Sequence, residues 1–102
     1  MVYEKFYEEL ERLHPDLYWK LGRVSLDYQL EAARLAEAQL RNSPSSLQLI
    51  EQVAGRYGDL ERTALEINQA LGSGSEQLPT SREDLTRAVA ELTEQVFMQR
   101  HR

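Results

Sequence analysis

Apolar residues recur along this chain at alternating steps of three and four, the spacing that places side chains on one face of an α-helix. The clearest example lies between Ser43 and Gly72. Seven residues follow the spacing there: Ile50, Val53, Tyr57, Leu60, Ala64, Ile67 and Leu71. Such a seam is typical of helices that pack side by side. It predicts one long helix over residues 44–71.

The preceding segment, residues 15–41, is apolar on two sides. One face carries Leu17, Leu21, Val24, Tyr28, Ala32, Leu35 and Ala38. A second row carries Leu26, Leu30, Ala33 and Leu40. The pattern predicts a second long helix. A helix that is apolar on two sides needs neighbours on both, which other helices of the chain or a second subunit would supply.

Two shorter amphipathic segments complete the pattern, at residues 2–13 and 82–99. The first has a stripe made of Val2, Phe6, Leu10 and Leu13. The last has a seam made of Leu85, Val89, Leu92 and Val96. Each is expected to form a helix with one apolar face.

The expected helix boundaries follow from proline, serine and glycine. Pro15 suits the first turn of the second helix. Ser43 is a good N-cap for the third helix, with Pro44 as its first residue, and Gly72 suits a helix end. Two capping pairs are available for the last helix, Thr80 with Glu83 or Ser81 with Asp84.

These elements predict an all-α fold, because no segment shows strand alternation bounded by hairpin turns. A chain of 102 residues is expected to form a single domain. The tight connection between the two long helices makes them antiparallel neighbours. The glycine- and serine-rich residues 72–79 are expected to be a flexible connection. We therefore expect a bundle of about four helices that packs further in a homodimer.

Composition narrows the range of functions. The formal net charge of −5 disfavours nucleic acid and anionic membrane surfaces as partners. No apolar run approaches the roughly 20 residues of a membrane span, and the first ten residues are acidic where a secretory signal would be basic. The chain has no cysteine, which fits a reducing cytoplasm. A cytoplasmic protein without membrane contact is the expectation.

The sequence contains few of the residue combinations that catalysis or metal binding requires. The only histidines are His14 and His101, and Ser25 has no paired base in the sequence pattern. Glu11 and His14 have the Glu-x-x-His spacing of di-iron bundles, which use two such pairs and two further glutamates. Only one such pair is present here. We expect no enzymatic activity, no cofactor and no metal.

A helix-turn-helix unit over residues 50–71 is the alternative interpretation. Ala54 and Gly58 lie where that motif places a small residue and a turn glycine. The second helix of such a unit would carry the acids Glu61 and Glu66 towards an anionic groove, which weakens the hypothesis. Its candidate DNA contacts are Arg56, Arg62, Asn68 and Gln69.

Binding to another protein through apolar helix faces explains more residues. An unbroken helix accounts for the continuous spacing across Gly55 and Gly58. Aromatic residues concentrate in the first third of the chain, either at an interface or in ordinary core packing. The expected function is that of an adaptor, a chaperone, or a regulator or inhibitor of a larger protein. The candidate interface residues are Tyr3, Phe6, Tyr7, Trp19, Leu26, Leu30, Ile50, Val53, Tyr57 and Leu60.

Overall fold

The computed structural model describes the backbone of residues 2–100 and the side chains of residues 2–96. Over that range the only regular secondary structure is helical. The helices are α1 (Glu4–Leu13), α2 (Pro15–Leu40), α3 (Ser46–Leu71) and α4 (Arg82–Arg100). The four predicted helices are all present, with ends that differ from the predicted ones by no more than two residues. The all-α prediction is confirmed.

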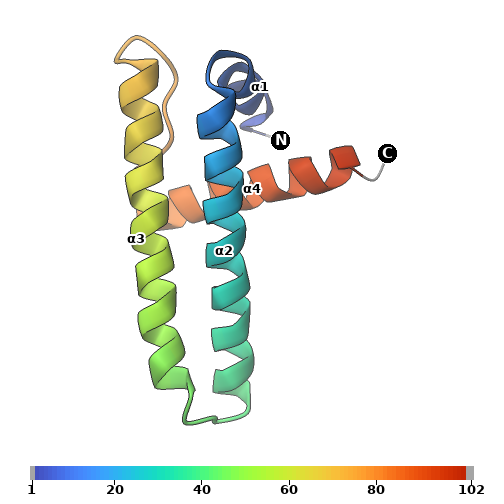
Figure 1. The fold of residues 1–102 in the computed structure, drawn as a ribbon, viewed down its shortest axis with the longest axis vertical. Helices are drawn as coiled ribbons and strands as arrows, with labels where there is room; N and C mark the ends of the chain where they lie inside the picture. Colours follow the sequence, from blue (N-terminus) through green and yellow to red (C-terminus); the bar gives the residue numbers. More distant parts are fainter. Residues whose placement is uncertain (1, 101–102) are drawn as a thin grey trace.

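The two long helices form an antiparallel hairpin that organises the molecule (Figure 1). α2 packs most extensively against α3 and also contacts both α1 and α4. α1 lies beside the upper end of α2, whereas α4 crosses behind the hairpin at a steep angle. Beyond the crossing, α4 continues past α2 on the side away from α3. The lower part of the hairpin therefore extends beyond the other two helices.

The turn of the hairpin differs from its prediction, because α3 begins at Ser46 rather than at Pro44. Asn42 adopts a left-handed φ of 51°. The Ser43 backbone N–H then donates a hydrogen bond to the Ala38 carbonyl at 2.9 Å. This arrangement is a common way to end a helix, with glycine or asparagine at the left-handed position. It turns the chain sharply, so that Ser43 and Pro44 belong to the turn.

The predicted end of α3 and the predicted start of α4 agree with the structure. Gly72 ends α3 with a φ of 80°, and its N–H donates to the Asn68 carbonyl at 3.1 Å. At the start of α4, the Ser81 hydroxyl donates to the Asp84 carboxylate at 2.9 Å and accepts from the Asp84 N–H at 3.3 Å. The second of the two possible capping pairs, Ser81 with Asp84, is therefore the one that forms.

The hydrophobic core lies at the upper end of the hairpin, where α1, α4 and the connection between α3 and α4 meet α2 and α3. Its buried members are Phe6, Tyr7, Leu10, Tyr18, Leu21, Tyr28, Leu60, Ala64, Ile67, Leu78, Leu85, Ala88, Val89 and Leu92. Residues from all four helices contribute to it, so that the core joins the elements into one unit.

A small polar cluster fixes the crossing of α4 over α2. The buried Ser25 hydroxyl lies 3.2 Å from the Val89 carbonyl and 3.2 Å from the Thr93 hydroxyl. The Gln29 amide donates to the Thr93 hydroxyl at 2.9 Å and to the Ser25 hydroxyl at 3.0 Å. Because these bonds need a particular side-chain geometry, they favour one position of α4 along α2.

The hairpin divides into two parts with different surroundings. We call residues 15–30 and 57–71 the core half, and residues 31–56 the free half. In the core half, both helices bury several residues against α1, α4 and each other. In the free half, the buried residues are Glu31, Ala38 and Val53 alone, among side chains that the structure describes throughout this range.

Candidate functional site

Of the ten candidate interface residues, four are buried inside the chain. Phe6, Tyr7 and Leu60 belong to the hydrophobic core. Val53 is buried in the free half of the hairpin. These four side chains contribute to folding of the single chain, and none of them is accessible to a partner on the folded surface.

The N-terminal aromatic residues connect α1 to α4. The Tyr7 hydroxyl donates a buried hydrogen bond to the Ala88 carbonyl, and the Tyr3 N–H donates to the Glu91 carboxylate at 2.8 Å. Burial raises the pKa of the Tyr7 phenol well above its usual range, and the nearby Glu91 carboxylate raises it further. Phe6 packs edge-on against Tyr7, with ring centres 5.6 Å apart. Phe6 and Tyr7 are thus part of the core, with Tyr3 packed against it.

Tyr57 occupies the boundary between the hairpin and α4. Its ring centre lies 5.8 Å from that of Tyr28 on α2, and the guanidinium carbon of Arg82 lies over the Tyr57 ring, 4.9 Å from the ring centre. A cation held over an aromatic face contributes about 0.5–1 kcal/mol at exposed sites. Burial raises the pKa of the Tyr57 phenol, with Glu61 as the next largest cause. Tyr57 is thus engaged within the chain.

α3 runs without interruption through residues 55–59, so the turn that a helix-turn-helix unit would need there is absent. Asn68, one candidate DNA contact, is buried, and its amide both donates to and accepts from the backbone of Leu78 at 3.1 and 2.8 Å. Arg62 pairs with Asp59 on the same helix, and Gln69 is exposed. The remaining candidate, Arg56, lies 3.9 Å from the Asp27 carboxylate.

The candidate residues that remain at the surface lie mainly on one face of α2. Starting at Trp19, steps of four and three pass down the helix on the side opposite α3. We call this set the outer stripe, and it consists of Trp19, Arg23, Leu26, Leu30, Ala33, Glu37 and Leu40. Trp19, Leu26 and Leu30 are 47, 47 and 50% exposed, and Leu40 is 86% exposed. The candidate residue Ile50, on α3, is also exposed.

The apolar pattern does not predict the buried carboxylate of Glu31 in the seam between α2 and α3. The face of α2 that meets α3 follows strict three–four steps and includes Glu31, where the apolar pattern suggested Ala32. One oxygen of Glu31 accepts from Arg34 at 3.3 Å, whereas Oε2 is buried and has no hydrogen-bond donor among the described residues. Continuing the spacing from Tyr28 by three would have found this position.

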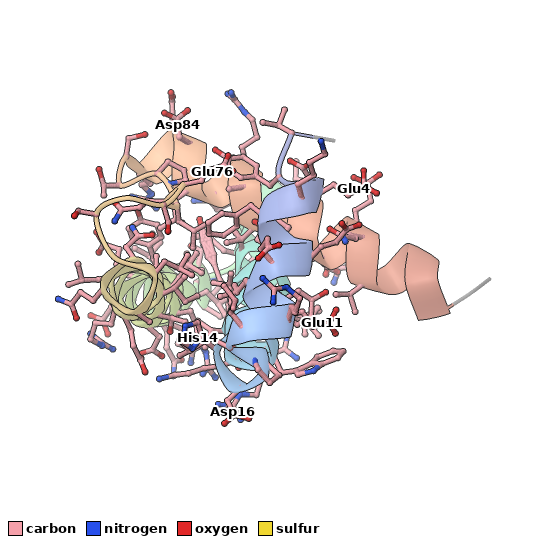
Figure 2. The ribbon with its side chains drawn as sticks, turned by 90° about the horizontal axis from the view of Figure 1, so that it is seen from above. Glu4, Glu11, His14, Asp16, Glu76 and Asp84 are labelled. Atoms are coloured by element: carbon pink, nitrogen blue, oxygen red, sulfur yellow. The ribbon has the colours of Figure 1, made fainter. Side chains whose placement is uncertain are left out.

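The acidic side chains and His14 that Figure 2 labels do not converge on one point. Figure 2 shows Glu4, Asp16 and Asp84 pointing outward in different directions, with His14 at the junction of α1 and α2. Among the described side chains, no group of three or more His, Asp or Glu residues is arranged to hold a metal ion. His101 lies outside the described residues.

The helices in the described range also lack the combination of length and apolar character that crossing a membrane requires. Comparisons with protein-family models, with characterised proteins and with solved structures find no match to this chain.

Proposed function

We propose that this chain is a non-enzymatic protein–protein interaction module that binds a partner helix along the outer stripe of α2. One observation carries the proposal: α2 has two faces with helix-packing spacing, and only one of them is covered. α3 covers the first face, which includes Leu21 and Tyr28. Leu26, Leu30 and Leu40 on the second face are half to largely exposed.

The energetics favour occupation of the stripe. Full burial of a leucine side chain contributes about 1.5–3 kcal/mol relative to leaving it exposed. Leu26 and Leu30 are each about half exposed, and they lie one helical turn apart. A helix that packs along α2 would therefore gain a continuous apolar contact. Single exposed leucines are ordinary on protein surfaces, but a row of them at helix-packing spacing favours a binding face.

A non-enzymatic role agrees with the chemistry of the described side chains. The buried hydroxyl of Ser25 contacts Val89, Thr93 and Gln29, and none of these is a base that could activate it. We assign the module to a reducing compartment, the cytoplasm, because it has no cysteine. An adaptor, a chaperone, or a regulator of a larger protein is the expected role.

A capture experiment in extract of the native host tests the proposal. The baits are the wild-type chain, Leu30→Glu on the outer stripe, and Leu65→Glu as the matched control, since Leu65 is an exposed leucine on α3. Quantitative mass spectrometry should find a host protein that wild type and Leu65→Glu retain and that Leu30→Glu loses at least tenfold. Circular dichroism and urea unfolding of each bait confirm that it is folded. Equal capture by all three baits, or capture of no protein, contradicts the proposal.

A further inference from the structure

We infer that the occupant of the outer stripe is a second copy of this chain, bound antiparallel about a two-fold axis that passes near Leu30. This inference rests on the proposed function for the choice of surface, and it adds the identity of the partner. Its basis is that the stripe is complementary to its own reversed copy in both charge and apolar character.

The spacing of the stripe is nearly symmetric about Leu30. Arg23 lies seven residues before Leu30, and Glu37 lies seven residues after it. In a two-fold antiparallel pair, each residue lies level with the one at the same distance on the other side of the centre. Arg23 of one copy therefore lies level with Glu37 of the second copy, and the reciprocal pair forms at the other end.

The apolar members of the stripe match in the same register. Leu30 lies level with Leu30 of the second copy. Leu26 lies four residues before Leu30, and Ala33 lies three residues after it. Leu26 of one copy therefore lies beside Ala33 of the second copy, with an offset of one residue, about 1.5 Å, along the helix axis. A large side chain thus packs against a small one. Trp19 lies eleven residues before Leu30 and Leu40 lies ten residues after it. Trp19 of one copy therefore lies beside Leu40 of the second copy at each end of the stripe. Every apolar member faces an apolar one, and each charge faces its opposite.

The charges decide between the possible orientations. Arg23 is exposed and has no acidic partner among the described residues. Glu37 contacts Arg41 at 2.8 Å, in a largely exposed pair of the kind that contributes little and is easily exchanged. A parallel pairing in register would place Arg23 beside Arg23 of the second copy and Glu37 beside Glu37, which is repulsive. The antiparallel pairing converts both contacts into attractive ones.

The size of the stripe sets the expected affinity. From Trp19 to Leu40 it is about 31 Å long at the rise of an α-helix. With the width of one helix, roughly 10 Å, it covers about 300 Å² on each copy, well below the roughly 800 Å² per partner of a standard interface. We therefore expect a dimer with a dissociation constant in the micromolar range.

Sedimentation equilibrium between about 1 and 100 μM tests the charge pairing. Wild type should show a monomer–dimer equilibrium, and Arg23→Glu or Glu37→Arg alone should weaken it at least tenfold. The double variant Arg23→Glu/Glu37→Arg should recover the wild-type constant, because each new glutamate then faces a new arginine. An equimolar mixture of the two single variants should form heterodimers for the same reason.

Disulfide trapping tests the register, and the chain offers a clean background because it has no cysteine. Leu30→Cys should oxidise readily to a covalent dimer. Leu40→Cys should not, since in the antiparallel pair it lies far from Leu40 of the second copy. Leu65→Cys, on α3, is the control for random collision.

A strict monomer at 100 μM overturns the inference. So does a dimer that does not respond to the charge variants, or one that Leu40→Cys traps better than Leu30→Cys does. If the chain is monomeric yet Leu30→Glu still abolishes capture of a host protein, this inference fails and the proposed function stands. If the dimer forms as described and no host protein is captured, the self-association remains and binding to a different protein is ruled out.

Discussion

The two halves of the α2–α3 hairpin share one sequence pattern and have different surroundings. In the core half, Leu21, Leu60 and Ile67 are fully buried among residues of α1, α4 and the connection that follows α3. In the free half, Ile50 continues the same three–four spacing yet is 45% exposed. The neighbouring Leu47 is 75% exposed.

Helical spacing determines the orientation of a helix, but it does not determine how completely the apolar face of that helix is buried. The spacing fixes which side of a helix faces its partner, because side chains three and four residues apart share a face. Complete burial needs a third element that closes the gap between two helices. α1 and α4 provide that closure at one end of the hairpin only.

The largest expected effect is the contrast between equivalent seam positions in the two halves. Leu60→Ala should destabilise the fold by about 2–5 kcal/mol, because it leaves a cavity in a packed core. Ile50→Ala should cost no more than about 1 kcal/mol, because the removed atoms are already half in water. Urea unfolding followed by circular dichroism measures both. Similar losses for the two variants would show that the free half is covered in solution.

The next effect concerns the contact between α1 and α4. Tyr7→Phe should destabilise the chain at neutral pH by about 1–2 kcal/mol, through loss of the buried hydrogen bond to the Ala88 carbonyl. The matched control is Tyr3→Phe, because the contact of Tyr3 with Glu91 uses its backbone N–H and not its hydroxyl. Thermal unfolding compares the two, and an equal loss for both would contradict a specific role of the Tyr7 hydroxyl.

The same residue gives a pH dependence with a definite sign. The pKa of Tyr7 is raised in the folded state above the ordinary value of 10.0, so the unfolded chain loses the proton first. Stability is therefore fully present below pH 10 and falls as the pH rises above it. In Tyr7→Phe the alkaline fall should be shallower than in wild type. Urea midpoints at pH 8, 10 and 11 provide the comparison.

A smaller effect, of opposite sign, is expected in the free half. Glu31→Leu should stabilise the hairpin by about 1–2 kcal/mol, because it replaces a buried carboxylate, held by one long bond to Arg34, with an apolar side chain. Glu51→Leu, at an exposed glutamate of α3 in the same half, is the control and should change stability little. Unfolding midpoints in urea test this, and a destabilised Glu31→Leu would mean that the carboxylate is satisfied in solution.

The smallest effect concerns the glycines within α3. A Cβ built at Gly55 meets no atom within 4 Å, and one at Gly58 meets only the Arg62 guanidinium at an ordinary contact distance. Gly55→Ala should therefore stabilise α3 by up to about 1 kcal/mol through helix propensity alone. Hydrogen exchange should show slower opening of the free half in this variant. Unchanged exchange there would mean that another process limits opening.

Much of the fold follows from local physical chemistry that a sequence displays. Helix periods, the proline at the start of α2 and Gly72 all act within a few residues, so they were predictable. The cap of α4 was predictable as one of two pairs, Thr80 with Glu83 or Ser81 with Asp84, and the second one forms. The start of α3 was not, because Asn42 in the left-handed region ended α2 in a way that moved Pro44 into the turn. Asparagine adopts that conformation less often than glycine does, and it gives a weaker signal.

The candidate site was predictable only in part, because exposure is decided by the tertiary arrangement. Leu30 and Leu60 both lie in apolar rows of long helices, yet one is half exposed and the other fully buried. The steep crossing of α4 decides such differences, and it depends on polar contacts such as Gln29 with Thr93. Two uncharged residues 64 positions apart give no periodic signal in a single sequence.

The side chain of Asn68 has a consequence for how this chain can be lengthened. Its side-chain amide donates a hydrogen bond to the Leu78 carbonyl and accepts one from the Leu78 N–H. Leu78 is itself buried in the core. The segment that leads into α4 is thereby held to α3 at Leu78. Between Gly72 and Leu78, residues 73–77 are exposed. Extra residues inserted at Gly74 should leave the placement of α4 unchanged, which makes this position a natural site for a fluorescent reporter.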